Sequence, residues 1–85
     1  MLSDKKTKLL EELNKGMCSD SLEDLSKKTA MSLQLVSYHI NGTPKSLGLK
    51  QLELVETTEL KGRTKVCLST MGRLFMKGYI KGNSR

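Results

Sequence analysis

Four polar side chains recur between residues 34 and 41 at spacings that place them on one face of a helix. They are Gln34, Ser37, Tyr38 and Asn41. Amide and hydroxyl groups both donate and accept hydrogen bonds, and the amides of Gln and Asn match the N6 and N7 atoms of adenine in the DNA major groove. The chemistry we expect from this face is hydrogen bonding to base edges. The alternative is an ordinary polar helix face in contact with water.

The positive charge of the chain is concentrated in particular segments. The formal net charge is +6, yet residues 1–60 carry eight Lys and nine Asp or Glu. Residues 61–85 carry seven Lys or Arg and no acidic residue, and a second acid-free window covers residues 25–52. Acid-free basic regions favour contact with a polyanion such as nucleic acid. The alternative is a solvated basic surface that favours solubility.

Several candidates for DNA-backbone contact lie beside this helix or in a predicted turn further along the chain. The basic candidates are Lys45, Lys61, Arg63 and Lys65. The three in the turn would contact phosphates, and Arg63 would alternatively enter the minor groove. Ser21 and Ser32 begin predicted helices whose first backbone N–H groups would face phosphates. The alternative for the turn residues is that they are solvated charges.

The first half of the chain predicts three helices. Ser3, Ser21 and Ser32 are candidate N-caps. Helices are expected over about residues 4–15, from Ser21 to a turn at residues 29–31, and from Ser32 to Asn41–Gly42. Their inward-facing apolar residues, chosen by helical spacing, are Leu9, Leu10, Leu13, Leu22, Leu25, Leu33, Val36 and Ile40. Met31 is expected to point inward and His39 to be packed, while Tyr38 is equally compatible with the core and with a contact surface.

The second half predicts a short helix, a hairpin and a last helix. Thr43-Pro44 is an N-cap followed by proline at the first helical position, which favours a helix over about 44–52 with Leu47 and Leu52 in the core. Strands are expected over about 54–60 and 64–68 around a glycine-centred turn. Ser69 would cap the last short helix, and residues 78–85 are expected to fray. The fold class is α+β, mainly α, in a single domain of residues 1–85 with an ordered core over about 3–77.

Composition excludes several classes of protein. Cys18 and Cys67 are far apart and, with the single histidine, supply three of the four ligands that a structural zinc site needs. We therefore expect free thiols and no metal, cofactor or small-molecule effector. The exposed face of the first helix, which includes Lys6, is expected to be solvated. No segment is apolar enough to cross a membrane or to act as a secretory signal, so a cytoplasmic, nucleoid-associated protein is expected.

Three segments carry motifs in the order known from one family of regulators. Residues 31–40, Met-Ser-Leu-Gln-Leu-Val-Ser-Tyr-His-Ile, are similar to a recognition helix that begins with Ser and contains a Val-Ser-x-His-hydrophobic run. Residues 48–56 and 62–74 are similar to the segment that leads into a β-hairpin wing and to the return strand with its following helix. The chain thus resembles the DNA-binding core of winged helix-turn-helix proteins, transcriptional regulators of the ArsR and MarR type.

The resemblance covers about residues 21–76 and departs from the family in three places. Glu53 stands where Gly is usual, and residues 41–44 interrupt what is usually a continuous helix into the wing. The metal-sensing cysteines and long dimerisation helices of those regulators have no counterpart, so neither metal sensing nor ligand sensing is expected.

The resemblance implies a small transcriptional repressor that binds double-stranded DNA. A single copy would contact one half-site, so a homodimer is expected, through the first helix or through the last helix with Phe75, Tyr79 and Ile80. The alternative function is a winged-helix protein-interaction module in a replication or transcription complex. RNA binding is disfavoured by the scarcity of aromatic residues. An enzyme is disfavoured because the sequence has no phosphate-binding loop and no paired carboxylates.

Overall fold

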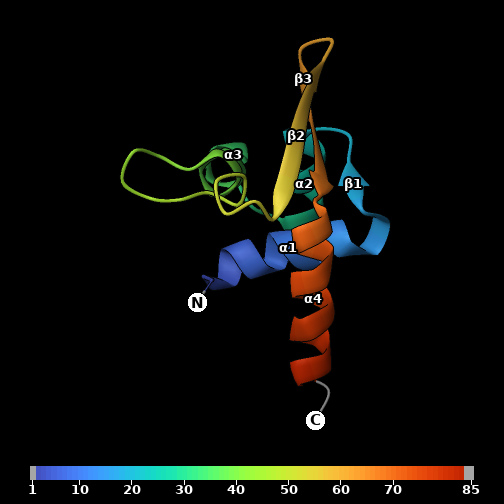
Figure 1. Ribbon diagram of the computed structural model, residues 1–85. Coiled ribbons are helices and arrows are strands. Elements are labelled where there is room, and N and C mark those ends of the chain that lie inside the picture. Colours follow the sequence, from blue (N-terminus) through green and yellow to red (C-terminus); the bar gives the residue numbers. More distant parts are fainter. Residues whose placement is uncertain (1, 84–85) are drawn as a thin grey trace.

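Serine side chains begin all four helices of residues 2–83, the part of the chain that the computed structural model describes (Figure 1). The helices are α1 (Asp4–Gly16), α2 (Leu22–Thr29), α3 (Leu33–Asn41) and α4 (Thr70–Asn83). The capping hydroxyls of Ser3, Ser21, Ser32 and Ser69 each accept a hydrogen bond from the backbone N–H three residues later. Each cap satisfies a donor that the first turn leaves free, and all four predicted caps are confirmed.

An antiparallel sheet of three strands connects the two halves of the chain. The strands are β1 (Cys18–Ser19), β2 (Val55–Leu60) and β3 (Arg63–Leu68), in the order β1-β3-β2. The predicted hairpin is confirmed: β2 and β3 pair from Val55↔Leu68 to Leu60↔Arg63. Lys61 and Gly62 make the turn with φ values of 51° and 78°, a backbone conformation that matches the twist of a two-residue hairpin. The fold is therefore α+β, as expected.

The core lies where α1, α2, α3, α4 and the base of the hairpin meet. Most of the predicted inward-facing residues are fully or nearly fully buried, among them Leu9, Leu10, Leu13, Leu25, Met31, Val36 and Ile40. Val66 and Leu68 of β3 and Met76 of α4 complete the core from the other side. In Figure 1 the hairpin and α4 extend from opposite ends of this core, and α1 crosses between them. No helix among residues 2–83 is long and apolar enough to span a bilayer.

The helix expected over residues 44–52 does not form. Thr43 and Ser46 exchange two backbone hydrogen bonds across a turn, and the chain then folds back so that Leu49 N donates to the His39 carbonyl oxygen at 2.8 Å. This return brings the backbones of Gly42 and Gly48 so close that a Cβ on either residue would overlap the other. Residues 43–48 therefore form a projecting loop, in which Leu47 is exposed and after which Leu49 enters the core.

The burial predicted for Leu33 and the predicted ends of the first and last helices differ from the structure. Leu33, expected in the core, is 44% exposed, because the buried side of α3 is formed by Val36, His39 and Ile40. The first helix, expected over about 4–15, ends one residue later at Gly16, and Met17 caps it with a positive φ of 72°. Residues 78–83, expected to fray, continue α4; residues 84–85 of that expected tail lie outside the described chain.

The connection between α1 and α2 contains a strand and a disulfide that the sequence did not predict. Cys18 of β1 pairs directly with Cys67 of β3, and the two form a disulfide with Cα atoms 4.0 Å apart. The expectation of free thiols is therefore wrong. The physical reason is the sheet register, because opposed residues of antiparallel strands have neighbouring Cβ atoms even when 49 positions separate them in the sequence.

Candidate nucleic-acid interface

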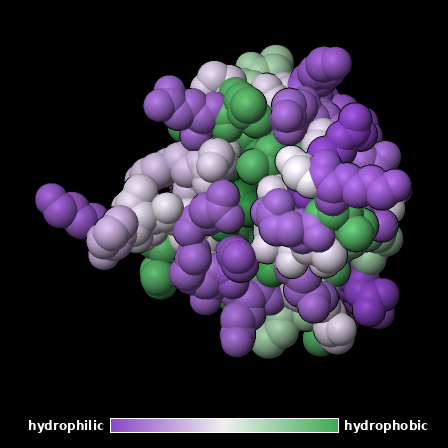
Figure 2. Space-filling view, turned by 90° about the horizontal axis from the view of Figure 1, so that it is seen from above, coloured by the Kyte–Doolittle hydropathy of each residue, from purple (hydrophilic) through white to green (hydrophobic). Residues whose placement is uncertain are grey.

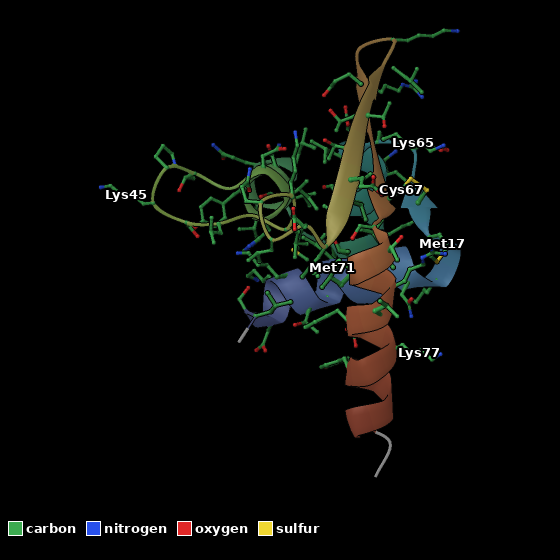
Figure 3. All side chains as sticks on the ribbon, in the orientation of Figure 1. Met17, Lys45, Lys65, Cys67, Met71 and Lys77 are labelled. Carbon is green, nitrogen blue, oxygen red and sulfur yellow. A yellow bond between two sulfur atoms is a disulfide. The ribbon has the colours of Figure 1, made fainter. Side chains whose placement is uncertain are left out.

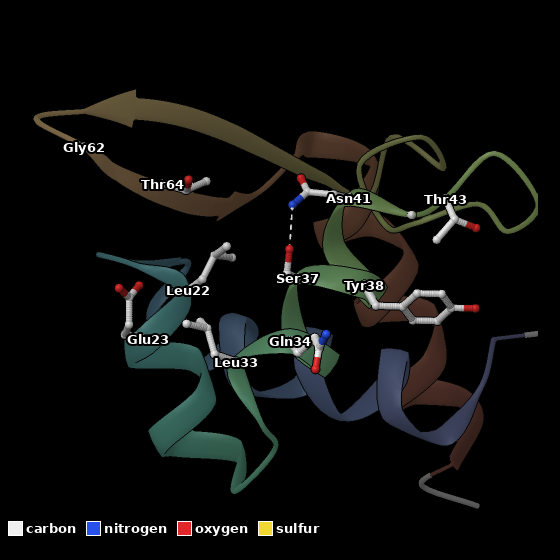
Figure 4. A pocket seen from close by; sticks show the side chains of 11 residues that line it. Leu22, Glu23, Leu33, Gln34, Ser37, Tyr38, Asn41, Thr43, Gly62 and Thr64 are labelled. Atoms are coloured by element: carbon white, nitrogen blue, oxygen red, sulfur yellow. Dashed lines mark hydrogen bonds between the residues drawn. The ribbon is translucent and has the colours of Figure 1, made fainter.

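A groove of about 760 Å³ lies between α3 and the tip of the β2–β3 hairpin (Figure 4). α3 lines it with Leu33, Gln34, Ser37, Tyr38 and Asn41. α2 adds Leu22 and Glu23 at one end, and Gly62 and Thr64 form the side made by the hairpin. All four polar residues expected on one helix face thus line the same groove. The predicted helical periodicity is correct for them, although it misplaced Leu33.

Burial on the opposite side of α3 fixes which residues face the groove. Val36, His39 and Ile40 are buried, so the opposite side of the helix, which carries Gln34, Tyr38 and Asn41, is turned outward. Within the groove, the Asn41 amide donates a hydrogen bond of 3.3 Å to the Ser37 hydroxyl (Figure 4). This bond orders the Asn41 side chain and leaves its carbonyl oxygen, an acceptor, directed away from Ser37.

Two buried residues, Lys6 and His39, lie against the ring of Tyr38. Its ring is 40% exposed and meets the His39 ring edge-on, with centroids 5.0 Å apart. The Lys6 ammonium lies 5.6 Å from the centre of the Tyr38 ring and 3.0 Å from His39 Nδ1. Tyr38 therefore belongs to the surface of the groove, while its position is fixed by packing against its neighbours.

Lys6 and His39 form a buried polar pair that connects α1 to α3. Burial lowers the pKa of His39, and the positive charges of Lys6 and Lys5 lower it further. Neutral His39 can accept a hydrogen bond from the Lys6 ammonium at Nδ1, which assigns the ring proton to Nε2. The expectation that His39 is packed is confirmed, whereas the expectation that Lys6 is solvated is wrong. Nothing in the local sequence brings residue 6 to residue 39.

The basic candidates do not all share the groove. Lys45 is exposed on the projecting loop of residues 43–48 (Figure 3), and Lys61 is exposed in the turn of the hairpin. Strand residues alternate between the two faces of a sheet, and Thr64 faces the groove. Arg63 and Lys65 consequently face the other side of the hairpin, where they line a separate hollow together with Asp20, Leu60 and Lys61 of the hairpin tip. The structure therefore separates these two residues from the polar face of α3.

Carboxylates already occupy the N-terminus of α2, which weakens its suitability for phosphate. Glu23 and Asp24 lie in its first turn. Hydrogen bonds from Ser19 and from Lys28 lower the pKa of Asp24, so this carboxylate is charged beside the positive helix end. The first turn of α3, by contrast, contains no acidic residue. Of the two helix N-termini predicted for phosphate contact, the one capped by Ser32 remains suitable.

Seen from the hairpin end, hydrophilic side chains surround a strip of hydrophobic surface (Figure 2). Among residues 2–83, no group of three or more His, Cys, Asp or Glu is arranged to hold a metal ion. No known family model matches the chain, and a comparison with curated proteins found no relative. The groove beside α3 is therefore the feature of the structure that bears most directly on function.

Proposed function

We propose that the chain is a winged helix-turn-helix domain that binds double-stranded DNA in a sequence-specific manner as a small transcriptional regulator. In this proposal α3 enters the major groove and the β2–β3 hairpin is the wing. One observation carries the proposal: the outward face of α3 is uncharged, rich in hydrogen-bonding groups and set beside a projecting hairpin. A helix of this kind fits the major groove, where base edges present donors and acceptors.

The arrangement of the elements supports the same proposal. α2 and α3 are joined by residues 30–32, with Ala30 in the left-handed conformation. Two helices joined by so short a turn are the arrangement of a helix-turn-helix motif. The hairpin follows α3 after the loop of residues 42–54, in the chain order of a winged module.

The basic residues suggest how the duplex backbone would be held. Lys45 and Lys61 are exposed on the loop and at the hairpin tip, so they would contact phosphates flanking the groove that receives α3. Such contacts supply affinity without sequence preference and weaken as salt rises. Arg63 and Lys65, on the far side of the hairpin, would meet the backbone only if the hairpin lay edge-on to the duplex.

A homodimer is part of the proposal, because one copy would contact a single half-site. An apolar groove of about 730 Å³ on α1 and α4 supports it, with Leu2, Leu52, Leu54, Phe75 and Tyr79 among its lining residues. Two copies joined there would bind half-sites about 10 base pairs apart. The same groove would serve the alternative function, a protein-interaction module that does not bind DNA specifically.

Selection from random double-stranded DNA, followed by affinity measurements on two variants, tests the proposal. Gln34→Ala should reduce the preference for one base over the others, at one position of the site, by roughly 1–3 kcal/mol. Lys61→Ala should weaken binding to all sequences and reduce the slope of log affinity against log salt by about one. Lys8→Ala, on the exposed surface of α1, is the control. If the three variants bind DNA alike, the DNA-binding assignment is wrong.

A further inference from the structure

Leu33 is a large apolar side chain on the groove face of α3. It is 44% exposed and lies in the same row as Ser37 and Asn41, one and two turns further along the helix. Figure 4 shows it at the end of the groove that it shares with Leu22. A single exposed leucine is common on protein surfaces. The feature that distinguishes Leu33 is its position among side chains suited to base edges.

The complete outward face of α3 has a chemical bias toward A·T base pairs. Gln34 and Asn41 can pair with the N6 and N7 atoms of adenine, and an apolar side chain can contact the C5-methyl group of thymine. Bidentate bonding to guanine needs an Arg or Lys, and residues 33–41 contain neither. Both bases of A·T pairs are therefore matched by groups on this face, adenine by the amides and thymine by Leu33.

We infer that Leu33 is a specificity-determining residue that contacts a thymine methyl group next to an adenine bound by Gln34. This inference rests on the proposed function and names the base pairs that the same site would take. Leu33 and Gln34 are the first two residues of α3, and the N-terminal residues of a recognition helix are the ones that contact base edges. Adjacent side chains would thus contact adjacent base pairs.

Glu23 offers a different base contact at this end of the groove, in competition with the contact proposed for Leu33. It lines the groove beside Leu33, and a carboxylate there can accept a hydrogen bond from the N4 amino group of cytosine. A preference for cytosine at the position facing Leu33 would therefore assign specificity to Glu23. The experiment separates these two outcomes.

The test uses the full chain and the DNA sequence selected in the preceding experiment. Each thymine is replaced in turn by deoxyuridine, which lacks the C5-methyl group. The wild-type chain should lose about four-fold in affinity at one position, the equivalent of about 0.8 kcal/mol for one buried methyl group. Leu33→Ala should bind the thymine and deoxyuridine forms of that site equally. Leu47→Ala, which removes a side chain that is 60% exposed on the loop, should retain the four-fold difference.

The failures of the two proposals are distinguishable. If selection yields no preferred sequence, the proposed function fails, and the inference fails with it. If the chain binds a preferred sequence whose thymines all tolerate deoxyuridine, or one with cytosine at this position, the inference alone is overturned. It is also overturned if Leu33→Ala discriminates between thymine and deoxyuridine as well as the wild-type chain does.

Discussion

Both α3 and α4 expose large apolar side chains, but in different surroundings. Leu33 of α3 lies in a groove among uncharged polar groups. Met71 and Leu74 of α4 are 55% and 64% exposed, on a helix whose charged residues are all basic. The difference teaches that an exposed leucine does not assign a surface by itself. The chemistry of its neighbours distinguishes the two surfaces: uncharged polar groups support the base contacts proposed for α3, whereas Phe75 and Tyr79 in the apolar groove support the partner proposed for α4.

The two helices also differ in how the rest of the fold holds them. α3 is held along its length by the core and at its end by the loop that returns through Gly48 to Leu49. α4 is held mainly at its start, where Gly72 lies against the Leu54 carbonyl group and Ser69 donates to the Glu53 carbonyl oxygen at 2.6 Å. Further along, Met76 is buried in the core and Tyr79 packs against it, and only the last turns of α4 extend away from the other elements (Figure 1). Three changes test this contrast.

The largest effect is expected at the point where α4 is attached. In Gly72→Ala the new Cβ would overlap the backbone carbonyl of Leu54, so the free energy of unfolding should fall by about 3 kcal/mol, the upper end for overpacking. Gly78→Ala is the matched control, because a Cβ there meets no atom within 4 Å. It should raise the free energy of unfolding by about 0.5–1 kcal/mol, since alanine favours the helix. Urea denaturation measures both, and equal effects would refute the attachment at Gly72.

A smaller effect is expected from the exposed side of α4. If the proposed dimer interface extends from the apolar groove onto the exposed side of α4, Leu74→Ser should raise the dimer dissociation constant about ten-fold, because it removes an apolar side chain from a buried interface. The stability of the monomer should change by less than about 0.5 kcal/mol. Sedimentation equilibrium measures the association, with Leu47→Ser on the projecting loop as the control. Unchanged association in Leu74→Ser would exclude this side of α4 from the interface.

The smallest effect concerns pH and should be confined to α3. Because the pKa of His39 is lowered in the folded chain, the unfolded chain binds a proton at higher pH. Acidification below about pH 6.5, the ordinary value for histidine, should therefore reduce stability until folded His39 is itself protonated. The sequence of α4 contains no histidine or carboxylate, so this helix contributes no comparable sensitivity.

Lys6→Met isolates the contribution of the buried pair. It removes the charge 3.0 Å from His39 Nδ1 and retains an apolar side chain of similar length. The pKa of His39, followed by NMR titration of its ring protons, should rise, and the loss of stability on acidification should shrink. Lys8→Met, on the exposed face of the same helix, should leave both unchanged. A His39 pKa that is identical in Lys6→Met and the wild-type chain would contradict the role of Lys6.

Local signals in the sequence predicted the elements that depend on local interactions. Serine caps fixed the starts of all four helices because a cap bonds to a donor three residues away. The glycine-centred turn was predicted over residues 61–63, and the structure has it one residue shorter, at Lys61–Gly62, because Arg63 already pairs with Leu60. The polar face of α3 was likewise predictable, because residues 34, 37, 38 and 41 are related by helical spacing alone.

Features that depend on distant residues were not predictable in this way. Thr43-Pro44 is a valid local start for a helix, but the close approach of Gly42 to Gly48 favours a returning loop. Leu33 and Leu35 both fit an apolar stripe with Val36, and the surrounding core selects the side that buries Leu35 in part and exposes Leu33. The pairing of β1 with β3 is similarly invisible in the sequence near either strand.

The disulfide gives the chain a mechanical property that follows from its position. Cys18 and Cys67 enclose α2, α3 and the hairpin in a covalent ring, and α1 and α4 lie outside it as two arms. When the chain is pulled from its ends, force passes from one arm to the other through the bond, and the ring bears none of it. Residues 19–66, which lie between the cysteines, then add nothing to the extended length, so that roughly 160–170 Å of chain stays unextended. Under tension the arms would unravel first, and the segment with the groove could not be extended for as long as the bond is intact.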